Sequence, residues 1–158
     1  MDKTLITVRA IGDADIESLI FHRLNYLREM QGEKEELYLK QLSIELLVFF
    51  TEGLNTKTFF GLVAEYCGEP VSFGGMVIRK IPGDFNGLSY LEADVINMYT
   101  LPDFRRNGIS EMILRGLIGE AHQMNISKLA LHTTRVGEKL YRSLGFDSPS
   151  YPYLELIL

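Results

Sequence analysis

The hydrophobic and polar residues of this chain follow two spacings, one typical of strands and one typical of helices. Residues 4–9 alternate between apolar and polar side chains and are rich in β-branched types, which predicts a first strand. Apolar residues three and four positions apart then predict helices over 13–30 and 33–53. We expect Asp13 to cap the first helix and Gly53 to end the second.

The rest of the chain predicts further strands interrupted by two helices. Two apolar runs separated by Gly68-Glu69-Pro70 have the pattern of a β-hairpin. The expected elements are strands at 59–67 and 71–78, a loop at 82–87, a strand at 91–101, a helix at 109–124, a strand at 126–132, a helix at 135–144 and a strand at 153–158. Hairpins combined with strand–helix–strand crossovers predict a mixed sheet with helices on both faces, an α/β (α+β) fold.

The composition is typical of one soluble domain over residues 1–158. The chain is 46% hydrophobic and 23% charged, which argues against disorder and against a small disulfide scaffold. Its formal net charge is −5, and no basic stripe stands out, so we expect no nucleic-acid partner. An acidic surface slightly favours a cationic small substrate.

The single cysteine, Cys67, can form neither an intrachain disulfide nor a zinc-ligand pair. The sequence also lacks an HExxH motif, so we expect no metal. The N-terminus has no long apolar region, and the longest apolar run, Leu46–Phe50, is too short to cross a bilayer. We therefore expect a cytoplasmic protein with no membrane partner.

The segment Asn97–Ser110 carries the first candidate site. It runs from a predicted strand through Arg105 and Arg106 into Gly108 and a predicted helix. Free N–H groups at a helix start, a glycine that permits close backbone approach and two cations together suit a pyrophosphate. The alternative interpretation is an ordinary loop whose arginines are solvated. A second informative segment, Leu129–Phe146, passes from a strand through polar residues into a short helix that bears Tyr141.

With these two segments the chain resembles the GCN5-related N-acetyltransferase (GNAT) superfamily. The cofactor motif of that family, Gln/Arg-x-x-Gly-x-Gly/Ala, is matched by Arg105–Ser110, in which Ser110 replaces the usual small residue. A tyrosine four residues before a Gly-Phe pair is matched by Tyr141 and Gly145-Phe146. An asparagine is common seven residues before that tyrosine, where this chain has Thr134. The two motifs occur in the family's order and at about its spacing.

The resemblance implies a twisted, mixed and mostly antiparallel sheet of six to seven strands with about four helices. Its strands at 91–101 and 126–132 would splay apart in a V that holds acetyl-CoA, the implied cosubstrate. In the family, the strand backbone pairs with the pantetheine and the loop N–H groups hold the pyrophosphate. The residues that this implies as cofactor-binding are Met98, Tyr99, Thr100, Arg105, Arg106, Asn107, Gly108, Ile109, Ser110 and Thr134.

The resemblance also implies catalytic groups. Family members often use the tyrosine matched by Tyr141 to protonate the leaving thiolate. An alkylamine is mostly protonated at neutral pH, so a base should help the attack. Asp94 and Glu92 share one face of the predicted strand and are the candidates, with Asp94 preferred. Alternatively, both carboxylates are solvated or pair with Arg79 or Lys80, and water removes the proton.

The function implied is acetyl-CoA-dependent N-acetyl transfer to a primary amine of a small molecule or peptide by direct attack. Two alternatives stay open: a non-catalytic acyl-CoA-binding or regulatory module, and an interaction protein without a cofactor. The sequence does not identify the acceptor amine. Homodimers are common in the family, so a homodimer is expected. Aromatic residues considered as walls of the acceptor pocket are Tyr26, Tyr38, Phe85 and Tyr90.

Overall fold

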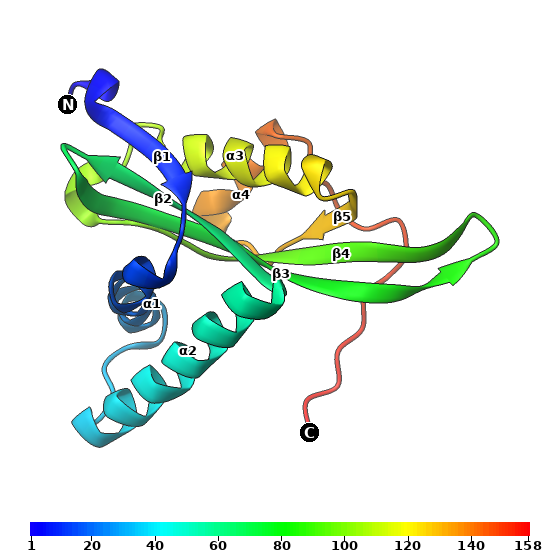
Figure 1. Cartoon of the computed structure of the whole chain (residues 1–158), viewed down its shortest axis with the longest axis horizontal. Coiled ribbons are helices and arrows are strands. Elements are labelled where there is room, and N and C mark those ends of the chain that lie inside the picture. Colours follow the sequence, from blue (N-terminus) through cyan, green and yellow to red (C-terminus); the bar gives the residue numbers. More distant parts are fainter.

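A single five-stranded sheet organises the molecule, with helices on both of its faces (Figure 1). The computed structural model describes all residues, 1–158. Its elements are β1 (Ile6–Ala10), α1 (Ile16–Gln31), α2 (Glu36–Thr56), β2 (Phe59–Tyr66), β3 (Glu69–Asp84), β4 (Gly87–Thr100), α3 (Ile109–Gln123), β5 (Ile126–Ala130) and α4 (Arg135–Ser143), with short 3-10 turns at Lys3–Leu5, Asp13–Asp15 and Pro102–Phe104. The sheet order is β1-β2-β3-β4-β5, antiparallel except for the parallel pair β4–β5. This arrangement confirms the predicted fold class.

Two apolar layers hold the helices against the sheet. On one face α1 and α2 bury Leu19 and Phe50 against Phe73 of β3. On the other face α3 buries Ile113 and Leu117 against β2, β3 and β4, and α4 packs at the margin of that layer. The buried residues of each helix recur at three and four positions, as amphipathic helices require. None of the helices combines the length and the apolar composition that crossing a bilayer demands.

The strand count predicted from the sequence is wrong. The sheet has five strands rather than six to seven, because residues 153–158 form no strand. After α4 the chain runs away from the sheet, and Tyr153, Leu154 and Leu156 are exposed (Figure 1). Alternating apolar residues indicate only a local preference for an extended backbone. A strand forms only where that segment can also pair with a neighbouring strand. In this chain the outer edge of β5 receives no such neighbour.

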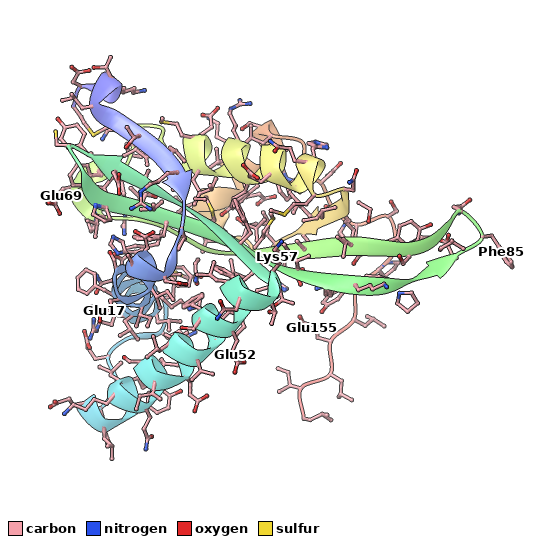
Figure 2. The ribbon with its side chains drawn as sticks, viewed as in Figure 1. Glu17, Glu52, Lys57, Glu69, Phe85 and Glu155 are labelled. Atoms are coloured by element: carbon pink, nitrogen blue, oxygen red, sulfur yellow. The ribbon has the colours of Figure 1, made fainter.

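The prediction of a loop at 82–87 is also wrong. β3 continues to Asp84 and β4 begins at Gly87, so the two strands form a long hairpin that projects beyond the sheet (Figure 1). Pro82 lies within this ladder, opposite Ser89. A two-stranded ribbon has a free outer edge on each strand, where the missing N–H of a proline costs no ladder bond. Phe85 stands at the hairpin tip, pointing away from the rest of the molecule (Figure 2).

The predicted helix boundaries need smaller corrections. The first helix begins at Ile16 after a 3-10 turn, and Asp13 does not cap it. Instead the carboxylate of Asp15 accepts a hydrogen bond from the backbone N–H of Gly12, at 2.8 Å. The second helix continues past Gly53 to Thr56 and ends at Lys57, which has a positive φ.

The sheet opens between β4 and β5, as predicted. The two strands pair from Leu91↔Ile126 to Asp94↔Ala130, and β4 then continues to Thr100 without a neighbour on that side. A bulge lies at the point of divergence. Gly75 pairs with Ile96 and Phe73 with Tyr99, so two residues of β4 oppose one residue of β3. The extra residue bends β4 away from β5 and increases its local twist.

The ion pair between Arg9 and Asp15 ties β1 to the start of α1. Both carboxylate oxygens of the buried Asp15 accept from Arg9, at 2.7 and 2.8 Å. This hydrogen bonding lowers the pKa of Asp15, so its stabilisation is present above the ordinary aspartate pKa and is lost as the pH falls. We expect Asp15→Asn to cost about 1–3 kcal/mol at neutral pH. Denaturation at about pH 7 and about pH 3 should show the difference shrinking in acid. Asp13→Asn, in the same turn but exposed, is the control.

Candidate functional site

The loop between β4 and α3 has the geometry of an anion site. Arg106 and Gly108 both adopt positive φ, +64° and +84°, on either side of Asn107. Asn107 fixes the turn by donating from its side chain to the carbonyls of Phe104 and Arg105, at 3.2 and 3.0 Å. The first intrahelical bond of α3 runs from the N–H of Met112 to Gly108, so the preceding N–H groups have no helical acceptor. Such N–H groups, together with the helix dipole, favour a phosphate.

A cation that the sequence did not single out stands beside this loop. A Cβ placed on Gly108 would lie 3.7 Å from the ammonium nitrogen of Lys3, which precedes β1. Arg106 is exposed in the same loop and makes no ion pair. The loop therefore has free positive charge from two distant parts of the sequence.

Ser110, which replaces the glycine or alanine of the cofactor motif, has a structural role. Its hydroxyl lies 3.0 Å from the hydroxyl of Thr100, which in turn lies 2.7 Å from that of Ser72. Ser72 also donates to the carbonyl of Tyr99, at 2.9 Å. This chain of hydroxyls links β3, the end of β4 and the first turn of α3. A hydroxyl at position 110 therefore fixes the helix start against the strand.

Arg105 is turned away from the loop toward α1. Its guanidinium donates to both carboxylate oxygens of Glu29 at 2.8 Å, and its Nε donates to the carbonyl of Thr100 at 2.8 Å. The hydroxyl of Tyr99 donates to Glu29 at 2.6 Å, and the guanidinium of Arg105 lies over the Tyr99 ring, 5.3 Å from its centroid. Arg105 thus braces the loop against α1 in this structure.

Replacing Glu29 should change the pKa of Tyr99. Burial, and then the hydrogen bond to Glu29, raise the pKa of Tyr99 to about 12. In Glu29→Gln we expect the pKa to fall toward 10 without reaching it, because the burial remains. NMR titration of labelled tyrosine measures this shift. Glu33→Gln, beyond the end of α1, is the matched control, and an equal shift in both variants would contradict the assignment.

Tyr141 projects from α4 into partly buried surroundings. Its ring packs against that of Phe146, with centroids 5.9 Å apart, and its hydroxyl makes no hydrogen bond within the chain. Burial, and then the nearby Tyr26 of α1, raise the pKa of Tyr141, so the phenol keeps its proton at neutral pH. Thr134 caps α4 by accepting from the N–H of Gly137, at 3.2 Å. Thr134 therefore orients the helix that carries Tyr141.

The two candidate bases are ion-paired. Arg79 of β3 contacts both Asp94 and Glu92, reaching Glu92 at 3.2 Å. Lys128 of β5 also binds Glu92, at 2.7 Å, and its hydrogen bond lowers the pKa of Glu92. Arg79 was one of the two partners considered from the sequence, whereas Lys128 was not. The lowered pKa makes Glu92 a poorer proton acceptor than an ordinary glutamate.

The structure brings together some predicted residues and separates others. Of the four aromatic residues considered as pocket walls, Tyr26 lies beside the opening, with its ring centroid 6.4 Å from that of Tyr99. Phe85 and Tyr90 belong to the distal hairpin, where Tyr90 donates to Asp84, and Tyr38 lies exposed on α2. Within this chain Phe85 and Tyr90 therefore lie away from the opening between β4 and β5.

Three polar residues near the opening are not among the candidate binding or catalytic residues chosen from the sequence. Asn97, the bulge residue with φ +57°, is buried and accepts from Arg23 of α1 at 2.7 Å. His22 is also buried, in contact with Phe73, and burial lowers its pKa. A signal exists in the sequence, since His22 and Arg23 stand three and four residues after the buried Leu19, on the face that packs against the sheet.

Comparisons with known proteins agree with this geometry. Residues 56–148 match the model of the acetyltransferase (GNAT) domain family. A predicted acetyltransferase from Clostridium acetobutylicum, solved with acetyl-CoA, is 25% identical, with 96% of each chain covered and a TM-score of 0.83. A GCN5-related N-acetyltransferase from Ralstonia eutropha JMP134 is 21% identical, with 96% of this chain and 98% of that chain covered and a TM-score of 0.78. The glucosamine-6-phosphate N-acetyltransferase of Arabidopsis thaliana is 16% identical, with 96% and 97% covered and a TM-score of 0.68.

No curated protein sequence matches the chain. The family model covers more than half of its residues, including the loop before α3 and the helix that carries Tyr141. The likeness in fold extends over nearly the whole length of each solved structure above. The chain belongs to the GNAT acetyltransferase family.

Proposed function

We propose that this protein is an N-acetyltransferase that moves the acetyl group of acetyl-CoA directly to a primary amine of a small molecule. The observation that carries the proposal is the divergence of β4 from β5 at a bulge, directly before an anion-binding loop. The unpaired end of β4 is followed directly by a loop that can bind phosphate. This order suits an extended cofactor that carries a pyrophosphate. The acetyl-CoA in the Clostridium acetobutylicum structure supports this cofactor for a chain of the same fold.

The residues present fit acetyl-CoA along its length. The N–H groups of Gly108, Ile109 and Ser110 would hold the pyrophosphate, with Arg106 and Lys3 supplying charge. The unpaired edge of β4 at Met98, Tyr99 and Thr100 would pair with the amide groups of the pantetheine, as an added strand does. The thioester would then lie between the bulge and Tyr141.

The reaction needs a base, an oxyanion donor and an acid. The neutral amine attacks the thioester carbonyl carbon, and a backbone N–H at the bulge stabilises the oxygen of the tetrahedral intermediate. The carbon–sulfur bond then breaks, and the thiolate takes the phenolic proton of Tyr141, which solvent restores. The amine proton leaves through water, with Asp94 as acceptor ahead of Glu92. Starting from the neutral amine, the net products are the acetamide and CoA thiol, because the amine proton given to solvent balances the proton that restores Tyr141.

Calorimetry followed by a turnover assay tests the proposal. We expect acetyl-CoA to bind one site per chain, and free CoA thiol to appear when a panel of primary amines is added. Binding without turnover of any amine would instead indicate a non-catalytic acyl-CoA module. No binding at all would reject both functions and leave the family likeness as a statement about fold alone.

A further inference from the structure

Arg23 is a half-buried cation without a carboxylate partner. It lies on α1, where its only polar contact is the neutral side-chain oxygen of Asn97, at 2.7 Å. Its guanidinium carbon lies 5.6 Å from the centroid of the Tyr26 ring. Burial lowers the pKa of Arg23, and no acid of the chain offsets that cost. By contrast, the six arginines at 9, 28, 79, 105, 115 and 142 all pair with an acid.

A second unmatched group adjoins Arg23. The side-chain nitrogen of Asn97 is buried and has no hydrogen-bond partner. Its oxygen is occupied by Arg23, so the amide is oriented with its N–H groups free. A buried donor without an acceptor is costly to folding, and such a group calls for an explanation such as a bound water, ion or ligand. Arg23 lacks an anion and the amide nitrogen of Asn97 lacks an acceptor, so one negatively charged acceptor would serve both.

These groups border the place where acetyl transfer would occur. Asn97 is the bulge residue and immediately precedes Met98, the start of the proposed pantetheine edge. Tyr26, one turn after Arg23, is close enough to Tyr141 to influence its pKa. Arg23 and Asn97 therefore lie beside the opening, at the bulge. An acceptor whose carboxylate they bind would extend its amine into the opening, toward the thioester.

The nearby acid of α1 cannot serve Arg23. Glu29 is occupied by Arg105 and by the hydroxyl of Tyr99. Asp94 and Glu92 are held by Arg79 and Lys128. The negative charge that Arg23 lacks must come from outside the chain. A planar guanidinium and a neighbouring amide N–H match the two oxygens of a carboxylate.

We propose that Arg23 and Asn97 bind a carboxylate on the acceptor, so that the preferred substrates are small amines of the amino-acid class. This inference rests on the proposed function and names its substrate class. It replaces the expectation of a purely cationic acceptor that the acidic composition suggested. A single cation favours a singly charged carboxylate over a phosphate, which would bring a second charge and a third oxygen.

Matched substrate pairs test the inference. Each amino acid is compared with the amine that remains when its carboxylate is removed, and kcat/KM is measured from CoA thiol release. We expect a preference of about 30-fold for the carboxylate in the wild-type protein. In Arg23→Met that preference should fall to less than about threefold, and Arg23→Lys should restore part of it. Arg28→Met, on the same helix but paired with Glu33, should keep the full preference.

Binding measurements separate this inference from the proposed function. Calorimetry gives the affinity of each variant for acetyl-CoA, and of its CoA complex for the preferred amino acid. Acetyl-CoA binding with no carboxylate preference, or with a preference for phosphorylated amines, would overturn the inference and leave the proposed function intact. So would an Arg23→Met variant that loses acetyl-CoA binding, since Arg23 would then support the fold. If the wild-type protein fails to bind acetyl-CoA, both fail.

Discussion

Gly108→Glu is expected to weaken acetyl-CoA binding by at least about 100-fold, or more than about 2.7 kcal/mol. Two effects combine. Gly108 has a φ of +84°, and a side chain in that left-handed region strains the turn by about 1–2 kcal/mol. The new carboxylate would also stand at the anion site, near Lys3, where it competes with the pyrophosphate and repels it. Calorimetric titration with acetyl-CoA measures the loss.

Gly119→Glu provides the matched control for this variant. Gly119 lies within α3, the helix that Gly108 precedes, has ordinary helical geometry, and an added Cβ there meets nothing within 4 Å. The chemical change and the change in net charge are therefore identical at the two positions. Equal acetyl-CoA affinity in both variants would show that the pyrophosphate binds elsewhere.

Tyr141→Phe is expected to lower kcat by about 100-fold while leaving the affinity for acetyl-CoA nearly unchanged. In the proposed reaction the phenol protonates the departing thiolate, and phenylalanine keeps the packing against Phe146 without the proton. Single-turnover kinetics with a preferred amine measure the chemical step. Tyr90→Phe, at the distal hairpin, serves as the control because its hydroxyl contacts only Asp84. Unchanged kcat in Tyr141→Phe would remove the assigned role.

The pH profile gives a second check on the same residue. Burial, followed by the influence of Tyr26, raises the pKa of Tyr141 above its ordinary value of 10.0. In the folded protein the Tyr141 phenol therefore keeps its proton at every pH below that value and begins to lose it only at higher pH. We expect no fall in kcat from this group between about pH 7 and pH 9. A fall in that interval that disappears in Tyr141→Phe would contradict the assignment.

The fold was largely predictable because most of its elements have strong periodic patterns. The helices at 16–31, 36–56 and 109–123 each bury an apolar face, and that face is visible in the sequence. The failures concern segments whose structure depends on a neighbour. Residues 153–158 have the pattern of a strand but pair with no other strand, whereas residues 82–84 have the pattern of a loop but pair with residues 87–89. The local sequence does not show whether a segment has a pairing partner in the folded protein.

The candidate site also has a part that the sequence could predict and a part that it could not. The loop from Arg105 to Ser110 is contiguous, so its motif could be identified from the sequence alone. The side chain of Arg105 nevertheless binds Glu29, 76 residues earlier, and Arg23 reaches Asn97 across 74 residues. Spacing along the chain does not encode such distant contacts. Only the packing of α1 across the end of β4 reveals them.

The bulge in β4 also reverses the parity of the strand. Before it, the even-numbered Ile96 faces α1 and α2, while Val95 faces α3. After it, the odd-numbered Tyr99 contacts rings of α1, while Met98 packs in the layer of α3. If the same residues paired without the bulge, simple alternation would send Tyr99 to the opposite side of the sheet, away from Glu29. The one extra residue therefore decides which layer each later side chain of β4 joins.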